Sequence, residues 1–203
     1  PNAVAQGLAT NRSRMVGMVI TFDPDDLFAD PNLLQVLHGV DAEVAEHDNA
    51  LLLSTARNAD DRLSAYRRLL DIRRADGILI ESGLGEEGIS LLLEQGYPCV
   101  VIGYSELGLP CVHPDDYGGA RQMATHLVDL GHRRIGIISG PPSNPPAMRA
   151  RFQAFHDTLI ERGVPWSDDL RVFGNFRRES GYEGAAALMA LRPPPTAIFA
   201  FND

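Results

Sequence analysis

The stretch ARQMATHLVDLGHRRIGII, residues 120–138, contains one helix and one strand of the kind that the rest of the chain repeats. The apolar residues of its first half share one helical face, at Ala120, Met123, Leu127 and Leu130. Gly131 ends this periodic pattern, as glycine commonly does after a helix. Residues 135–138 (IGII) form an unbroken apolar run, which is typical of a parallel strand covered on both faces. The stretch therefore predicts a helix that leads into a buried strand.

The same pattern recurs on both sides of this stretch. Five further apolar runs are MVGMVI at 15–20, ALLL at 50–53, GILI at 77–80, CVVI at 99–102 and AIFAF at 197–201. Helical periodicity fills the intervals, through Leu33, Leu37, Val40 and Val44 and again through Phe152, Phe155 and Leu159. Gly96 and Gly163 follow the last periodic residue of their segments. Strands that alternate with helices predict a doubly wound α/β architecture with parallel sheets.

One interval, residues 104–117, does not fit the alternation, because it contains two prolines, a glycine and an acidic pair. We interpret it as a crossover between two lobes, 15–113 and 114–203. The sequence stops directly after an apolar strand, so we expect the second lobe to be incomplete. The proline-rich loop at 140–146 follows the strand at 135–138. Because ligands in open α/β sheets bind outside the carboxyl ends of strands, this loop is a candidate rim of a binding site.

The composition is that of an ordinary soluble globular chain with an acidic balance. Among 203 residues, 18 are Lys or Arg and 27 are Asp or Glu, which gives a formal net charge of −9. An acidic body repels phosphate, so we expect no general nucleic-acid-binding surface. Cys99 and Cys111 are interpreted as reduced thiols of a cytoplasmic protein. No apolar run approaches the length of a membrane span, and the first residues lack the features of a signal peptide, although a mature secreted form would look the same.

Three ordered stretches carry a family resemblance. The first comprises residues 1–9 (PNAVAQGLA), Arg12-Ser13 and the strand at 16–20. The second runs from DDYGGA at 115–120 through His126-Leu127 to LGHRRIG at 130–136, and the third from Gly181-Tyr182 to PTAIFAFND at 195–203. In order and spacing, over essentially the whole chain, these stretches resemble the LacI/GalR family of bacterial transcription regulators.

The resemblance implies a type I periplasmic-binding-protein-like core whose two lobes enclose a small effector, usually a sugar, a nucleoside or a related metabolite. It also implies a homodimer with a helix-turn-helix headpiece that binds operator DNA, and this headpiece is absent from the sequence. Residues 1–14 correspond to the hinge helix and its linker. Val4 and Leu8 share one helical face, with Ala5 beside them, and Leu8 occupies the position that wedges into the minor groove. A helix this short is marginal in water, so a frayed tail is the alternative.

The resemblance also points to effector contacts in the second lobe. Arg151 matches the family's effector-binding arginine, on the first turn of the helix after the proline-rich loop, where a guanidinium can donate a fork of hydrogen bonds. Taken alone, a helical arginine is more often solvated. Phe176 matches a position that often supplies a stacking aromatic, with a place in the core as the alternative.

Further candidates are polar residues at strand ends or helix starts. Asn202 and Asp203 end a strand, where they contact the effector or cap a turn. Asp115 either accepts from an effector hydroxyl or caps the helix that begins near Asp116. In the first lobe, Asn32 opens the helix after the first strand, and Ser82 follows the run GILI. An acidic loop at 23–26 favours a neutral or cationic effector over a phosphorylated one, although exposed carboxylates are usually only solvated.

The sequence does not favour an enzyme. It contains no G-x-S-x-G elbow, no phosphate-binding P-loop and no H-E-x-x-H motif, so we expect no catalytic residue, no metal and no cofactor. The nearer rival is a secreted solute-binding protein of the same fold, which serves a transporter or receptor. Residues 1–14 favour the repressor, because an exported protein has no use for a minor-groove helix. We therefore expect a cytoplasmic sensor whose effector changes the affinity for operator DNA.

Overall fold

The computed structural model describes residues 12–20, 30–70, 75–81, 86–143 and 145–202. The chain divides into two compact units, Pro1–Val112 and His113–Asp203. Each unit is an α/β layer structure built on a parallel sheet, as the apolar runs predict. The hinge residues Val4, Ala5 and Leu8 lie outside the described residues.

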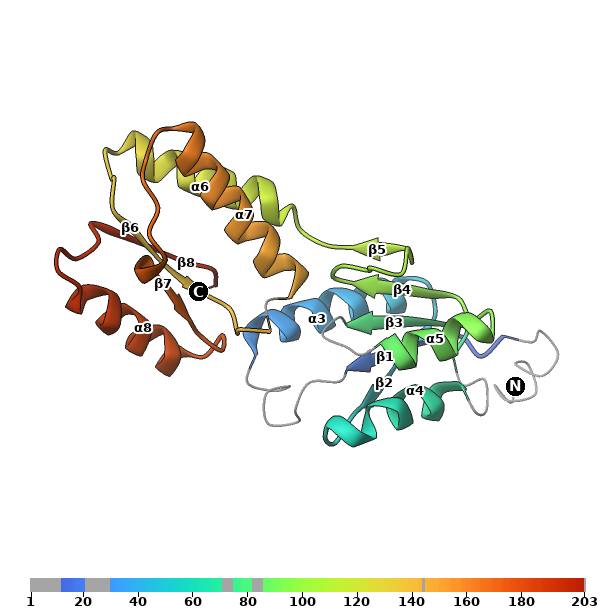
Figure 1. Cartoon of the computed structure of the whole chain (residues 1–203). Helices are drawn as coiled ribbons and strands as arrows, with labels where there is room; N and C mark the ends of the chain where they lie inside the picture. Colours follow the sequence, from blue (N-terminus) through green and yellow to red (C-terminus); the bar gives the residue numbers. More distant parts are fainter. Residues whose placement is uncertain (1–11, 21–29, 71–74, 82–85, 144, 203) are drawn as a thin grey trace. The chain divides into compact units, whose positions relative to one another are not determined.

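The first unit is built on a five-stranded sheet in the order β2-β1-β3-β4-β5 (Figure 1). Its described elements are β1 (Met15–Ile20), α3 (Pro31–Glu46), β2 (Ala50–Thr55), a short 3₁₀ turn (Ala59–Asp61), α4 (Arg62–Leu70), β3 (Gly77–Glu81), α5 (Glu86–Glu94), β4 (Cys99–Ile102) and β5 (Cys111–Val112). All of its strand pairs are parallel. The carboxyl ends of these strands therefore form one edge of the sheet.

Helices cover both faces of this sheet. Met18 and Ile20 of β1 are fully buried with Leu33 of α3 on one face. Val19, which points to the opposite face, lies in a separate cluster with residues of α4 and α5, among them Leu69 and Leu92. Burial on both faces explains why the strand sequence is continuously apolar rather than alternating.

The second unit has a three-stranded sheet in the order β7-β6-β8. Its elements are α6 (Asp116–Asp129), β6 (Ile135–Ser139), α7 (Pro146–Glu161), a 3₁₀ turn (Asp168–Leu170), β7 (Arg171–Phe173), α8 (Arg178–Ala190) and β8 (Ala197–Ala200). Figure 1 shows α6 and α7 together on one face of the sheet and α8 on the other. Ile135 and Ile137 of β6 are buried against Phe155 and Leu159 of α7, which form the centre of this core.

The predicted elements agree with the structure, with two omissions. All six apolar runs form strands, and Gly96, Gly131 and Gly163 adopt positive φ angles of 60°, 92° and 65° after their helices. The apolar runs do not predict β5, which lies inside the predicted crossover, or β7, which begins with an arginine. Both missed strands lie at the edge of their sheet.

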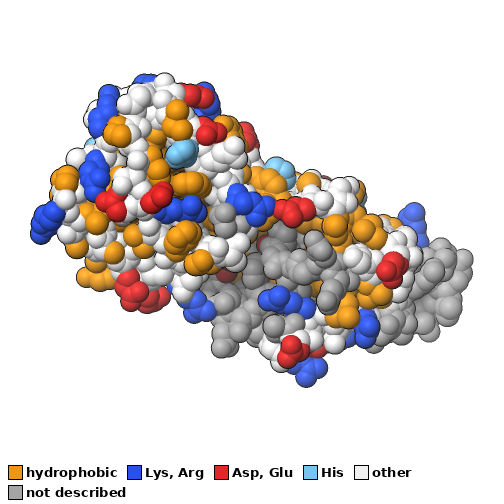
Figure 2. All heavy atoms as spheres, in the orientation of Figure 1, with side chains coloured by type: hydrophobic (Ala, Val, Ile, Leu, Met, Phe, Trp, Pro, Cys, Tyr) orange, Lys and Arg blue, Asp and Glu red, His pale blue; other side chains and the backbone are white. Residues whose placement is uncertain are grey.

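None of the described helices combines the length and the apolar character that a membrane span needs. On the face drawn in Figure 2, arginine side chains lie among aspartate and glutamate side chains, and no large basic patch stands out over the described residues.

Candidate functional site

Arg151 lies at the carboxyl edge of the second sheet, where β8 ends. Its Nε is 2.6 Å from Oδ1 of Asp116 on α6, and its Nη1 donates a hydrogen bond to the backbone carbonyl of Phe201. The guanidinium is thus fixed by one carboxylate and one carbonyl from two different elements. Its Nη2 has no partner among the described residues, so the N–H groups of Nη2 can still donate to a further acceptor.

Asp116 is the buried half of this ion pair, with a side chain only 2% exposed against 27% for Arg151. Its Oδ2 is buried and has no hydrogen-bond partner in the described part of the chain. Sequence reasoning missed this residue, although it carries a signal. Asp116 heads a stripe at i, i+4 spacing that continues through the buried Ala120 and Ala124 of the same helix. A carboxylate at the start of a buried stripe indicates an internal partner.

Phe176 and Asn202 extend the same edge. The Asn202 side-chain nitrogen donates to the Phe176 carbonyl at 3.3 Å, and Phe176 itself has a positive φ of 67°. The residue is 46% exposed, so Phe176 is not a core residue. A Cβ on Gly140 would lie 2.5 Å from the Phe176 ring, which means that only glycine allows the ring to lie over this loop.

Asp115 caps α6, which is one of the two roles that the sequence allows for it. Its Oδ1 accepts a hydrogen bond from the Gly118 backbone N–H at 2.8 Å. A side-chain oxygen at this position satisfies one of the free donors at the helix start. Contact between Asp115 and an effector stays a prediction.

One detail of the sequence analysis is wrong. Arg151 is not on the first turn of its helix, because α7 already begins at Pro146, inside the proline-rich loop. Proline suits the first helical position, since its fixed φ fits the helix and its missing N–H would have had no partner there. Arg151 therefore lies on the second turn, where it reaches Asp116 and the end of β8.

The carboxyl edge of the first sheet also carries polar groups. Asn32 is exposed on the first turn of α3, and its backbone N–H donates to the capping Asp30 at 2.8 Å. Glu81 ends β3; burial raises the pKa of its carboxyl to about 8, and the charge of Asp30 adds to the effect. A carboxyl with this pKa is mostly protonated at neutral pH and is a hydrogen-bond donor. Sequence reasoning missed Glu81, although it directly ends an apolar run.

Two further predicted site residues, Ser82 and Asp203, lie outside the described residues. The structure thus brings Arg151, Asn202 and Phe176 together within one unit and adds Asp116 to them. Within the described ranges, no three His, Cys, Asp or Glu side chains cluster as they would around a metal ion. The combination of a fixed guanidinium, a buried carboxylate and an exposed aromatic ring suits a small polar ligand that offers both hydroxyls and an apolar face.

Comparison with known proteins gives a consistent result. A family model described as "Periplasmic binding proteins and sugar binding domain of LacI family" matches residues 15–203. The HTH-type transcriptional repressor PurR of Mannheimia succiniciproducens is 30% identical over 207 residues. That match covers 100% of this chain but 60% of the relative, so the chain spans about three fifths of the length of such curated proteins.

Solved structures agree with the family match. A putative transcriptional regulator LacI from Bacillus cereus subsp. cytotoxis superposes with a TM-score of 0.84 at 28% identity, over 92% of this chain and 67% of that one. The transcriptional regulator CelR in complex with cellobiose superposes with a TM-score of 0.79 at 28% identity, over 97% of this chain and 63% of that one.

Proposed function

Because the chain belongs to the family of periplasmic binding proteins and LacI-family sugar-binding domains, we propose that it is the effector-sensing part of a DNA-binding transcription repressor. The similarity to an HTH-type transcriptional repressor supports this function over that of a secreted solute-binding protein. In this proposal the full-length protein is a cytoplasmic homodimer that reads operator DNA through a separate headpiece and the hinge at 1–14. The function is binding rather than catalysis.

The proposed effector is a small carbohydrate or a related polyhydroxylated metabolite. The observation that carries this choice is the charge-balanced pair of Arg151 and Asp116 at the carboxyl edge of the second sheet. An effector hydroxyl that donates to Asp116 Oδ2 and accepts from Arg151 Nη2 would satisfy both groups. The exposed ring of Phe176 is the apolar platform in this proposal, and the cellobiose complex of CelR supports the ligand class.

The remaining contacts belong to the same proposal. We keep Asn202, Asp203 and Asp115 as predicted effector contacts of the second lobe, for which we propose the bounds 114–203. Asn32 and Ser82 are the predicted effector contacts of the first lobe, 15–113. Effector binding then biases the protein between states with different affinity for operator DNA.

The test is a saccharide screen on the full-length protein, with cellobiose among the compounds, followed by calorimetry. We expect at least one saccharide to bind the wild type, and Arg151→Ala to abolish this binding while circular dichroism still shows a folded protein. Arg121→Gln is the matched control, because Arg121 pairs with Glu161 on the exposed faces of α6 and α7. Unchanged affinity in Arg151→Ala removes Arg151 from the site, and the absence of any saccharide binding overturns the ligand class.

A further inference from the structure

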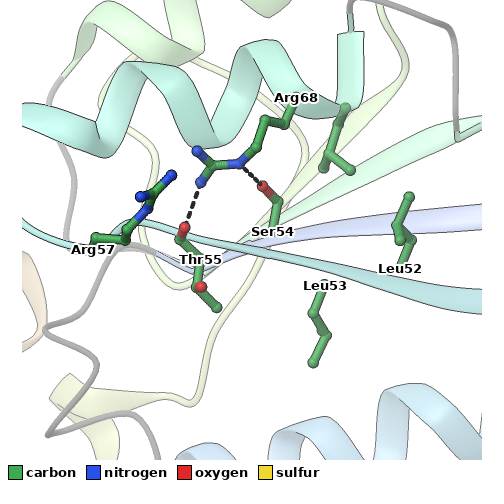
Figure 3. Close-up of a pocket in the computed structure, with 7 residues that line it drawn as sticks. Leu52, Leu53, Ser54, Thr55, Arg57 and Arg68 are labelled. Atoms are coloured by element: carbon green, nitrogen blue, oxygen red, sulfur yellow. Dashed lines mark hydrogen bonds between the residues drawn. The ribbon is translucent and has the colours of Figure 1, made fainter.

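A cavity of about 300 Å³ lies in the first unit, between the carboxyl half of β2 and helix α4. Its lining consists of Leu52, Leu53, Ser54, Thr55, Arg57, Arg68 and Leu69. Figure 3 shows the guanidinium groups of Arg57 and Arg68 toward one end of the cavity and the side chains of Leu52 and Leu53, which precede Ser54 on β2, away from them. Every lining residue is described, and none belongs to the proposed effector site.

Arg68 is held in place before any ligand binds. Its Nε donates to the Ser54 hydroxyl at 3.4 Å and its Nη2 to the Thr55 carbonyl. Its Nη1 lies 3.3 Å from Oδ1 of Asp61. The partners of these contacts lie on β2 and on the 3₁₀ turn, while Arg68 itself lies on α4, so the guanidinium plane has little freedom. A donor that is already oriented loses little conformational entropy when it binds an anion.

Arg57 adds a second cation to the lining of the cavity. Its side chain is 82% exposed, and the carboxylate with which it pairs in the described chain is Asp61, at 3.6 Å. Asp61 therefore forms an ion pair with each of the two arginines. The Arg57 backbone N–H and the Arg68 guanidinium hold the pKa of Asp61 below its usual value, so this carboxylate is ionised at neutral pH.

The charge of the group follows directly. Two guanidinium cations and one carboxylate leave one net positive charge at the cavity, in a chain whose formal net charge is −9. A guanidinium group is planar and can donate two parallel hydrogen bonds to two oxygens of one phosphate, an arrangement that a monatomic anion such as chloride does not offer. We propose that this cavity binds inorganic phosphate or the phosphate group of a small phosphate monoester.

The experiment is calorimetric titration of the wild type with sodium phosphate, with sodium chloride at equal ionic strength as the blank. Because phosphate also stabilises proteins by exclusion from their surface, a saturable heat is the criterion rather than a rise in melting temperature. We expect saturable binding of phosphate that Arg57→Gln weakens about tenfold, since one of two charge-assisted contacts is lost.

The control is Arg67→Gln, which removes the same charge from an exposed position of α4 that does not line the cavity. We expect this variant to bind phosphate as the wild type does. Equal weakening in both variants indicates unspecific attraction and overturns the proposal, as does the absence of saturable binding. Arg68→Lys keeps the positive charge but removes the planar guanidinium group. We expect this variant to bind phosphate more weakly and to remain folded.

Titrations with glucose 6-phosphate and, separately, with glucose decide whether the cavity binds free phosphate or a phosphate monoester. Tighter binding of the ester than of inorganic phosphate, with the same dependence on Arg57, supports a metabolite phosphate; weaker binding supports free phosphate. Glucose that binds through Arg151 but not through Arg57 reports on the proposed effector site alone. The two proposals therefore fail independently.

Discussion

Each unit has an arginine that joins a helix to the carboxyl end of a strand, but the two arginines differ in how their charge is balanced. In the second unit, Arg151 pairs with the buried Asp116, and the pair is neutral, with one carboxylate oxygen that has no hydrogen-bond partner among the described residues. In the first unit, Arg68 shares Asp61 with Arg57, and the group keeps a positive charge. The same local design thus favours a neutral hydroxylated ligand in one place and an anion in the other.

Removal of the carboxylates is expected to produce the largest difference between the units. Asp116→Ala leaves a partly buried guanidinium without its counter-ion, and we expect a loss of about 3 kcal/mol in the free energy of unfolding. Asp61→Ala affects a more exposed pair, and we expect a clearly smaller loss in the free energy of unfolding. Urea unfolding of both variants measures the comparison. Equal losses would contradict the distinction between a buried and a solvated pair.

The pH dependence of stability sharpens the comparison within the first unit. Burial raises the pKa of Glu81 from 4.5 to about 8, so between these values the folded chain holds a proton that the unfolded chain releases. Stability therefore falls as pH rises through this window and levels off above it. Glu81→Gln has no titrating carboxyl at this position. Between pH 5 and pH 8.5 we therefore expect its free energy of unfolding to fall by on the order of 2 kcal/mol less than that of the wild type. Parallel pH profiles of the two proteins would rule out the raised pKa.

Displacement of the Phe176 ring tests the proposed effector site in the second unit without any change of charge. A Cβ at Gly140 would come within 2.5 Å of the Phe176 ring and 2.8 Å of Met148. We expect Gly140→Ala to cost about 1–2 kcal/mol and to weaken saccharide binding, because the ring must move. Phosphate binding in the first unit serves as the internal control and stays unchanged. Full saccharide affinity in this variant would exclude Phe176 as the platform.

Two buried side-chain oxygens in the described residues have no hydrogen-bond partner, Asp116 Oδ2 and the Tyr66 hydroxyl. Burial raises the pKa of Tyr66 to about 12, and its ring packs against Gly88 of α5. We assign the first oxygen to ligand binding and the second to packing alone. Tyr66→Phe is therefore expected to stabilise the chain by up to about 1 kcal/mol, since an unsatisfied group is removed. A loss of stability on urea unfolding would show that the hydroxyl is hydrogen bonded in solution.

Much of the fold follows from hydrophobic pattern, and the exceptions have a physical cause. Strands such as β1 and β6 are covered on both faces, so their sequences are continuously apolar and easily recognised. The strands β5 and β7 have only two and three residues, too few for a recognisable apolar run. The edge strands β2 and β8 are longer, and each carries an apolar run that predicts it.

The site was less predictable than the fold. The family resemblance pointed to Arg151 and Phe176, but the partner of Arg151 lies 35 positions away in sequence and on another helix. The pairing of Arg68 with Ser54 likewise depends on how α4 lies on β2. Contacts of this kind arise only when helices pack on the sheet, so residue type and spacing alone do not specify them.

The most direct test of the central claim is the affinity of the full-length protein for operator DNA, measured by fluorescence anisotropy with and without the saccharide that binds best. We expect the saccharide to change the operator affinity of the wild type at least about fivefold, as allosteric coupling energies usually allow, and to leave the Arg151→Ala variant unchanged. An operator affinity that does not respond to saccharide in the wild type, or that responds equally in the variant, would contradict the account of this chain as an effector sensor that works through Arg151.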